Sequence, residues 1–253
     1  RRIDSIIDIG RIASLRTIVV AGNALEIGAA AAYSDAESAI ARHYPDFAEL
    51  IRRLGAVQVR NVGTFGGNIA NGSPIADTPP ALIALGARLV LRRGDSRRTM
   101  PLEDFFIAYG KQDRAPGEFV ERIDVPLLDD PMRLKCYKLS KRFDQDISAV
   151  CGCFNVRVDD GRAIDARVCF GGMAETPKRA RAVEAALTGQ PWTEATIERA
   201  LPMFERDYAP IGDLRGTAAY RMQAAKNLLR RYHLESQARA PAVRLAGRAA
   251  AFG

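Results

Sequence analysis

Residues 58–77 read QVRNVGTFGGNIANGSPIAD, and this stretch decides how the rest of the chain is interpreted. It is rich in glycine and amide side chains and lies inside an otherwise apolar chain. A long connection of this composition is entropically costly to order, so such loops usually bind a ligand. We therefore predict a binding loop over residues 55–76, in which the paired Gly66 and Gly67 let consecutive backbone N–H groups approach a phosphate or a polar ring edge.

Three side chains of this stretch can add contacts to a ligand. Thr64 and Asn68 carry hydrogen-bond donors, and Asp77 can accept from ligand hydroxyls such as those of a sugar chain. A second interpretation is also open from the pattern, namely a tight turn in which Asp77 is only the N-cap of the next helix. The stretch matches neither the phosphate loop G-x-x-x-x-G-K-[ST] nor the dinucleotide pattern G-x-G-x-x-G.

On both sides of this stretch the apolar pattern predicts a mixed α and β chain. Strands are expected at residues 6–9, 17–21, 24–29, 88–91, 98–100, 118–125, 134–139, 149–158 and 164–170. Helices are expected at residues 34–40, 47–54, 77–85, 176–187, 193–204 and 214–232. Prolines and aspartates at 126–131 indicate a boundary, which predicts domains at 1–129 and 130–235 and a disordered basic tail at 236–253.

The composition restricts the class of protein. The chain has 253 residues, 47% of them hydrophobic, which allows a core without disulfides or metals and excludes global disorder. The most apolar run, residues 81–87, is far shorter than the roughly 20 residues of a membrane span. The net charge is +7, but three of the arginines lie beyond Glu235, and no aromatic residues alternate with basic ones. We therefore expect neither a nucleic acid nor a membrane as partner.

The four cysteines, Cys136, Cys151, Cys153 and Cys169, form no C-x-x-C pair. Cys151 and Cys153 alternate along an expected strand, so they face the same side and are interpreted as small core residues rather than metal ligands. Free thiols without a visible signal peptide predict a reducing, cytoplasmic location. We predict no metal site and no catalytic acid or base.

The stretch also resembles a known family. TFGGNI at residues 64–69, followed by SPIAD at 73–77, is similar to the second flavin-binding segment of the molybdenum hydroxylase flavoproteins. The similarity continues through PLEDFF (101–106), YKLSKR (137–142), DIS (146–148) and FGGMA (170–174), and reaches about residue 234. Each segment alone is weak evidence, but their joint occurrence in this order is specific. The resemblance is closest to the small subunits of bacterial xanthine dehydrogenases.

The resemblance implies a fold. It implies an α+β chain, with an FAD-binding domain of the vanillyl-alcohol-oxidase-like type over residues 1–129 and a small domain of a three-stranded antiparallel sheet with three helices over residues 130–235. In the family, an earlier glycine-bearing loop grips the FAD pyrophosphate, and cysteine-rich iron–sulfur domains precede it. Both would lie upstream of Arg1, so we expect the sequence to be truncated at its N-terminus and its FAD site to be partial.

The resemblance also implies a set of cofactor-binding residues. Thr64, Phe65, Gly66, Gly67 and Asn68 would lie along the flavin and its phosphates, Asp77 would bond to the cofactor, Val120 and Lys138 would flank the flavin, Leu54 falls where relatives often carry an aromatic ring, and Tyr109 matches a tyrosine that stacks on NAD+. From the residues alone, Phe65 and Val120 also fit core positions, and Lys138 also fits a solvent-exposed strand lysine.

The function that the resemblance implies is electron transfer. The chain would be the FAD-binding subunit of a xanthine dehydrogenase, which passes electrons from a molybdenum centre through 2Fe-2S clusters to FAD and on to NAD+ while hypoxanthine or xanthine is oxidised to urate. A large partner subunit would hold the molybdopterin, which predicts a hetero-oligomer. Two alternatives stay open: the flavin subunit of a carbon monoxide, nicotinate or aldehyde dehydrogenase, and a non-catalytic docking scaffold.

Overall fold

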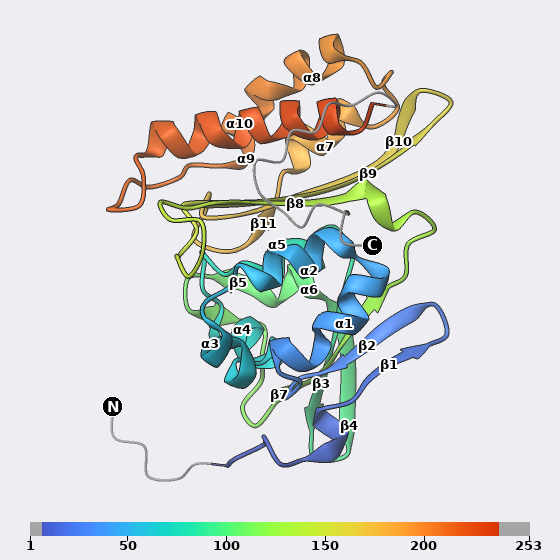
Figure 1. The fold of residues 1–253 in the computed structure, drawn as a ribbon, viewed down its shortest axis with the longest axis vertical. Coiled ribbons are helices and arrows are strands. Elements are labelled where there is room, and N and C mark those ends of the chain that lie inside the picture. The colour runs from blue at the N-terminus through green and yellow to red at the C-terminus, as the bar shows by residue number, and fades with distance from the viewer. Residues whose placement is uncertain (1–6, 238–253) are drawn as a thin grey trace, which may run out of the picture.

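The computed structural model describes residues 7–237, which form two large antiparallel sheets (Figure 1) and a two-stranded sheet of β5 (Phe106–Ala108) and β6 (Lys111–Gln112). The first sheet has the strand order β1-β2-β7-β3-β4. Its strands are β1 (Ile18–Ala21), β2 (Ala24–Gly28), β7 (Phe119–Pro126), β3 (Arg88–Arg93) and β4 (Ser96–Pro101). A bulge at Glu121 shifts the register between β7 and β3, and it lets Val120 point into the same core as Ile123.

Two helices lie between the sheets and explain why the chain is compact there. Helix α2 (Pro45–Arg52) contacts the second sheet at its edge, and α5 (Thr78–Ala84) contacts its two central strands. Every residue of α5 is buried, as expected for a helix that is apolar on all sides. Helix α1 (Tyr33–His43) packs beside α2, and a short 3-10 turn, η1 (Ala13–Leu15), precedes β1.

The structure corrects two expectations near the N-terminal end. Residues 55–76 are not one loop, because they contain helices α3 (Val57–Val62) and α4 (Phe65–Asn71). The side chain of Thr64 caps α4, so glycine content alone was a poor guide to this segment. The strand expected at 6–9 is absent over residues 7–9, which are exposed and pair with no other strand, and residue 6 lies outside the described residues.

The second sheet has the order β11-β10-β9-β8 and carries its helices on one face (Figure 1). Its strands are β8 (Leu134–Leu139), β9 (Val150–Asp159), β10 (Arg162–Gly171) and β11 (Lys178–Arg179). The helical elements are η2 (Pro131–Arg133), α7 (Arg181–Leu187), α8 (Glu194–Ala200), η3 (Leu201–Met203), α9 (Phe204–Asp207) and α10 (Ala218–Glu235). The expected α+β class and its order are confirmed, and the two-residue β11 adds a fourth strand to the three expected.

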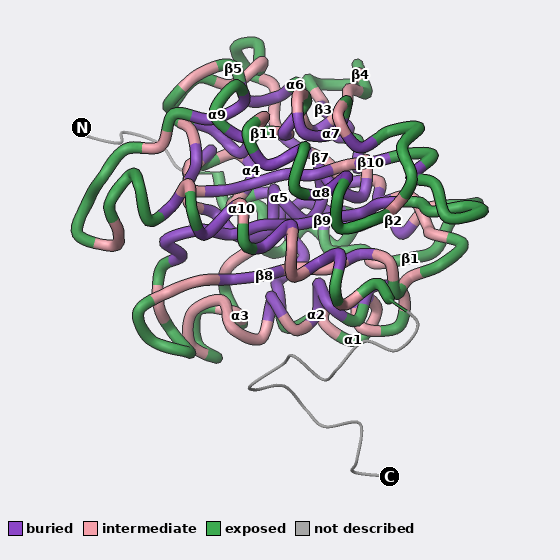
Figure 2. The backbone as a smooth tube through the Cα atoms, turned by 90° about the horizontal axis from the view of Figure 1, so that it is seen from above, coloured by how far each residue is buried: buried purple, intermediate pink, exposed green. Residues whose placement is uncertain are grey.

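Strand β9 separates two hydrophobic cores. On one face Cys151 and Cys153 join the core of the first sheet, and on the other face Phe154 packs under the helices, with its ring stacked on that of Tyr232 at 5.2 Å. Figure 2 shows this buried centre and the exposed loops around it. Both cysteines are buried as free thiols, which confirms the core interpretation. None of the described helices is long and apolar enough to cross a membrane.

An ion cluster joins the first domain, built on the first sheet, to the second domain, built on the second sheet. Glu103 of α6 (Leu102–Phe105), just before β5 (Phe106–Ala108), accepts from Arg167 at 2.5 Å, Arg179 at 3.0 Å and Arg181 at 2.7 Å. Burial raises the pKa of the Glu103 carboxyl, but the charges of these arginines outweigh it, so the pKa lies below its ordinary value of 4.5.

We expect Glu103→Gln to remove part of the acid sensitivity of folding. Because the folded-state pKa of Glu103 is lowered, its contribution is fully present above pH 4.5 and is lost as the pH falls through the folded-state value. At neutral pH the free energy of unfolding of the variant should be lower by on the order of 1 kcal/mol, and the loss stays this small because solvent partly screens the cluster. The check is denaturant unfolding between pH 7 and pH 3. Asp104→Asn, a substitution of an exposed neighbour on the same helix, should leave the fall in the free energy of unfolding at acid pH unchanged. If Glu103→Gln shows the same fall as the parent protein, the assignment is contradicted.

Candidate functional site

A cleft of about 330 Å³ opens between the first domain and the loop that follows β8. Its walls include Leu54, Asn68 and Asp77 from the first domain and Lys138, Ile147 and Ser148 from the second. Four of the residues that the sequence analysis selected, Leu54, Asn68, Asp77 and Lys138, therefore meet in one cavity although they come from distant parts of the chain.

At the base of this cleft Asp77 and Lys138 form a buried ion pair. The Lys138 ammonium donates to Asp77 Oδ2 at 2.6 Å, and the two side chains are only 2% and 7% exposed. The hydroxyl of Ser148, which is also buried, donates to the other carboxylate oxygen. Asp77 occupies the N-cap position of α5, but its side chain makes no cap bond. The interpretations of Asp77 as a simple cap and of Lys138 as an exposed lysine are therefore both wrong.

This arrangement matches the two buried charges and gives each carboxylate oxygen of Asp77 a donor. Charges removed from water are tolerated only when they are matched and their remaining hydrogen-bonding positions are filled. Ser148 fills one of these positions on Asp77. Ser148 has no predicted role, because no local sequence signal shows that it reaches a carboxylate 71 residues away.

The N-terminal turn of α4 does not offer free amides. Phe65 N–H donates to Ala31 at 3.3 Å and Gly66 N–H donates to the Ala29 carbonyl at 3.0 Å. The N–H groups of the next two residues donate to Thr64, one to its hydroxyl at 3.1 Å and one to its carbonyl at 3.0 Å. The expected cradle of consecutive unpaired N–H groups is therefore not present, because the fold uses these donors to cap the helix and to tie it to the chain after β2.

The two glycines of the pair have different surroundings. A Cβ on Gly66 would lie 2.4 Å from the Ala29 Cβ and 2.7 Å from its carbonyl oxygen, so only glycine allows this close approach. Gly67 is exposed, and a Cβ there would meet only Thr64 Oγ1, at 2.8 Å. Gly66 therefore serves packing, whereas Gly67 presents bare backbone on the outside of α4, the helix whose Asn68 lines the cleft.

Two selected residues have side chains in the core instead of the cleft. The Phe65 ring is fully buried and packs edge-on against Tyr33 at 4.8 Å. Val120 is buried on β7 opposite Leu91. Their positions agree with the core alternative for both side chains, and a cofactor contact by either residue stays a prediction.

Tyr109 lies apart from the cleft lining. It forms the turn between β5 and β6 (Lys111–Gln112) and is 72% exposed. The same hairpin packs onto α4, because Gln112 lies against Gly72 at the C-terminal end of that helix. An exposed aromatic ring near α4 is free to stack on a ligand, and the NAD+ contact stays a prediction.

The loop between β8 and β9 is fixed over the cleft by Arg53, which the sequence analysis did not select. Its guanidinium donates to the carbonyl oxygens of Phe143 at 3.1 Å and Lys138 at 3.2 Å, and lies 4.5 Å from the centre of the Phe143 ring. Within the loop, Asp146 accepts from the backbone of Arg142 at 2.8 Å, and this bond lowers the pKa of Asp146. No local sequence signal identifies Arg53, because its partners lie about 90 residues along the chain.

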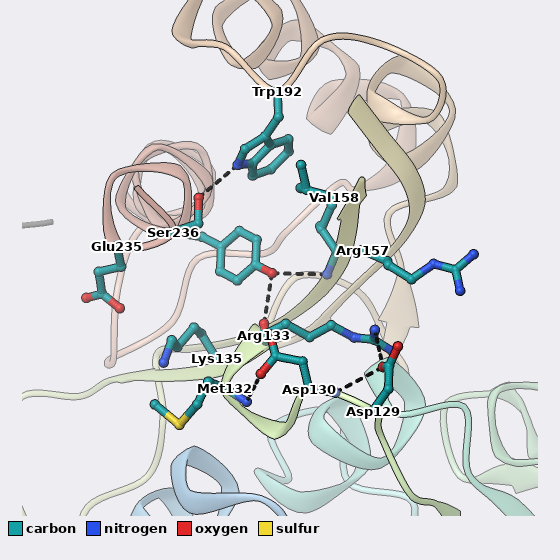
Figure 3. Close-up of a pocket in the computed structure, with 12 residues that line it drawn as sticks. Asp129, Asp130, Met132, Arg133, Lys135, Arg157, Val158, Trp192, Glu235 and Ser236 are labelled. Atoms are coloured by element: carbon teal, nitrogen blue, oxygen red, sulfur yellow. Dashed lines mark hydrogen bonds and ion pairs between the residues drawn. The ribbon is translucent and has the colours of Figure 1, made fainter. Parts of the chain in front are cut away.

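A larger pocket of about 460 Å³ lies elsewhere, between α10, β9 and the segment that joins the domains (Figure 3). None of the selected residues lines it. Several of its polar atoms bond to one another: Trp192 Nε1 donates to Ser236 at 2.8 Å, and the Tyr232 hydroxyl donates to the Arg133 carbonyl at 2.8 Å (Figure 3). We therefore assign the chemistry to the smaller cleft, where a buried ion pair converges with the selected residues. Among residues 7–237 no group of three histidine, cysteine or acidic side chains is placed to hold a metal ion.

Comparison with known proteins gives two family matches. Residues 1–128 match the family described as the FAD binding domain in molybdopterin dehydrogenase, and residues 135–236 match the CO dehydrogenase flavoprotein C-terminal domain. A xanthine dehydrogenase from Emericella nidulans is 32% identical over 240 residues, which cover 89% of this chain and 18% of that protein. The chain therefore spans about a fifth of that relative.

Two further relatives have lengths closer to that of this chain. The glyceraldehyde dehydrogenase medium chain of Sulfolobus acidocaldarius is 30% identical over 227 residues, which cover 89% of this chain and 80% of that one. A solved chain of a carbon monoxide dehydrogenase from Hydrogenophaga pseudoflava superposes with a TM-score of 0.82 and 32% identity, covering 88% of this chain and 78% of that one.

Proposed function

The chain belongs to the FAD-binding flavoproteins of the molybdopterin dehydrogenases, and we propose that it holds FAD in the cleft beside α4 as the flavin subunit of a xanthine dehydrogenase. The observation that carries the cofactor assignment is the buried Asp77–Lys138 pair at the base of that cleft. A cleft in which a buried carboxylate, an ammonium and a hydroxyl converge is a candidate binding site.

The lining of the cleft suits one end of a flavin nucleotide. Asn68 and Ser73 offer amide and hydroxyl groups for a polyol chain, and Leu54 and Ile147 offer apolar surface for a ring. The volume of about 330 Å³ is near the lower end of small-molecule sites, which are roughly 300–1,000 Å³. The described residues therefore fit a part of FAD.

Bound FAD would supply the exchange between single electrons and hydride that the family's chemistry needs. The protein's own residues would bind the cofactor and orient it. The Asp77 carboxylate accepts from ligand hydroxyls, Lys138 keeps a positive charge at the base of the cleft, and Ile147 restricts water at its rim. None of these binding roles requires a residue to move a proton, and the absence of a catalytic acid or base stays a prediction.

The proposed reaction of the assembled enzyme is the oxidation of hypoxanthine or xanthine to urate with NAD+ as acceptor. The proposed partner is a molybdenum-binding large subunit in a cytoplasmic hetero-oligomer, with 2Fe-2S clusters between the two sites. The similarity to a xanthine dehydrogenase supports these substrates. The similarity to a carbon monoxide dehydrogenase, at equal identity, supports the alternative of a flavin subunit of another molybdenum hydroxylase. Assay of the assembled enzyme with xanthine, nicotinate, glyceraldehyde and carbon monoxide, each with NAD+ or a dye as acceptor, separates the candidates.

The test of the cofactor assignment is direct. The assembled protein should show visible flavin absorbance and release FAD on denaturation, and the stripped protein should recover the absorbance when FAD is added back. The absence of flavin under every condition of reconstitution would overturn the assignment and favour a docking scaffold.

We expect Gly67→Val to weaken FAD binding by at least about tenfold, or roughly 1.4 kcal/mol. Gly67 is exposed on α4 and directly precedes Asn68, which lines the cleft, so under this proposal a branched side chain at Gly67 would crowd the bound cofactor. The measurement is a fluorescence titration with FAD, with thermal unfolding as the control for folding. Gly67→Ala should have a smaller effect, and equal FAD affinity in all three proteins would contradict the placement.

A further inference from the structure

Arg221, on α10, is among the largest side chains that are fully buried, with 2% of its surface exposed. A guanidinium is very rarely buried to this extent, because its desolvation is expensive unless partners surround it. Ala225 and Leu229, which follow Arg221 on the same face of the helix, pack into the second hydrophobic core. Its burial therefore needs a separate explanation.

The partners of Arg221 are two backbone carbonyls and one carboxylate. Its Nη1 donates to the carbonyl oxygens of Ala149 and Gly172, the latter at 2.9 Å, and its Nη2 donates to Asp213 Oδ1 at 2.6 Å. Its Nε is buried without a hydrogen-bond partner in the described residues. The two carbonyls and the ion pair thus set the position of the guanidinium, and in this position its Nε–H has no acceptor in the described residues.

Both carbonyls belong to residues that are linked directly to the cleft, Ala149 by the chain and Gly172 by a hydrogen bond. Ala149 directly follows Ser148, whose hydroxyl donates to Asp77. The N–H of Gly172 donates to the Pro74 carbonyl at 2.8 Å, and Pro74 lies between two cleft-lining residues. One guanidinium in the second domain therefore fixes the segment that carries Ser148 and, through Gly172, the segment that leads to Asp77.

The backbone at this junction is built for such a bridge. Gly172 has a φ of +82°, and a Cβ there would lie 2.4 Å from the Ala149 carbonyl oxygen and 3.0 Å from Arg221 Nη1. Only glycine allows the two carbonyls to approach one another closely enough to share a single Nη1. An ion pair with Asp213 alone would hold α10 in place and would not require this arrangement.

We propose that Arg221 is a positioning residue of the flavin cleft, which acts through Ala149 and Ser148 to orient the Asp77 carboxylate. This inference rests on the proposed function, since it assigns the oriented carboxylate to flavin binding. Without the guanidinium, Ser148 no longer holds Asp77 in one orientation, and Asp77 turns fully to Lys138. Flavin affinity and the environment of the flavin ring should then change.

The experiment compares Arg221→Lys with Arg230→Lys, a matched control on the same helix whose partner Glu198 is exposed. Arg221→Lys keeps the charge but cannot reach both carbonyls and Asp213 together. We expect it to raise the dissociation constant for FAD about tenfold and to shift the flavin absorbance bands and midpoint potential, while Arg230→Lys changes neither. A lowered melting temperature with unchanged affinity, spectrum and potential would overturn the proposal, because a structural role alone gives that result.

A double-variant cycle tests the route through Ser148. If Arg221 acts through Ser148, Arg221→Lys should add little to the FAD affinity lost in Ser148→Ala, and fully additive losses would overturn the route. If Arg221→Lys fails to fold, Asp213→Asn replaces it, with an expected loss of about threefold in affinity, and no loss would count against the proposal.

Amide hydrogen exchange separates failure of this inference from failure of the proposed function. Exchange near residues 146–150 and 73–76 should speed up in Arg221→Lys and not in Arg230→Lys, whether or not FAD binds. Faster exchange in a protein whose unsubstituted form binds no FAD would reject the proposed function and the flavin role of Arg221 together. Unchanged exchange in a protein that does bind FAD would reject only the positioning role.

Discussion

Lys138→Met should destabilise the chain by about 3–5 kcal/mol, because it leaves the Asp77 carboxylate buried without its countercharge. The Ser148 hydroxyl is the remaining side-chain donor to that carboxylate and cannot replace a full positive charge. The double variant Asp77→Asn/Lys138→Met should recover at least half of this loss, since it removes both charges together. Denaturant unfolding of the two single variants and the double variant measures the effect.

An exposed pair on the same chain provides the control. Arg230 and Glu198 form a pair at 2.6 Å whose side chains are 39% and 45% exposed. Arg230→Met should therefore cost no more than about 1 kcal/mol. A similar small cost for Lys138→Met would mean that water reaches the pair in solution. FAD affinity should fall in the double variant although stability returns, because we propose that the charged pair contacts the cofactor.

The second large effect is expected from Gly66→Ala, which should destabilise the chain by about 2–4 kcal/mol. The new methyl group would meet the backbone of Ala29, which cannot move without disturbing the chain after β2. Gly67→Ala, one residue along the same helix, should be within about 1 kcal/mol of the parent, because its methyl meets only a side-chain oxygen. Urea unfolding of the two variants is the measurement, and equal losses would show that the first turn of α4 is adjustable.

The local pattern was sufficient for a mixed α and β chain and for most strands, because β-branched runs bounded by Gly and Pro are local signals, whereas the α+β class came from the family resemblance. The helices α3 and α4 were missed for a physical reason. In α4, Gly66 satisfies a long-range contact with Ala29, and local propensity does not contain that information. Helix α3 has no glycine, but three of its six residues are valines, which have low intrinsic helix propensity. The strand expected at residues 6–9 failed in the opposite way, since a suitable local pattern found no partner strand over residues 7–9.

The site was partly predictable, and only through family resemblance. Asp77 and Lys138 are 61 residues apart, and no spacing rule connects them. Their meeting depends on α5 lying against β9 and on the register of β8 with β9, which places Lys138 opposite Cys151. Arg53, Ser148 and Arg221 act on the same region through carbonyls or a carboxylate, and bonds to backbone oxygens leave little trace in a single sequence.

The cleft draws its acidic group from one domain and its ammonium from the other. By thermodynamic linkage, a ligand that binds only this closed arrangement must also strengthen the cohesion of the two halves, by RT ln(1 + [L]/Kd). Dissociation of the cofactor and separation of the first domain from the second are then coupled equilibria. Protonation of Glu103 weakens the ion cluster that joins the two domains, and it should therefore weaken FAD binding in the proposed cleft although Glu103 does not line that cleft.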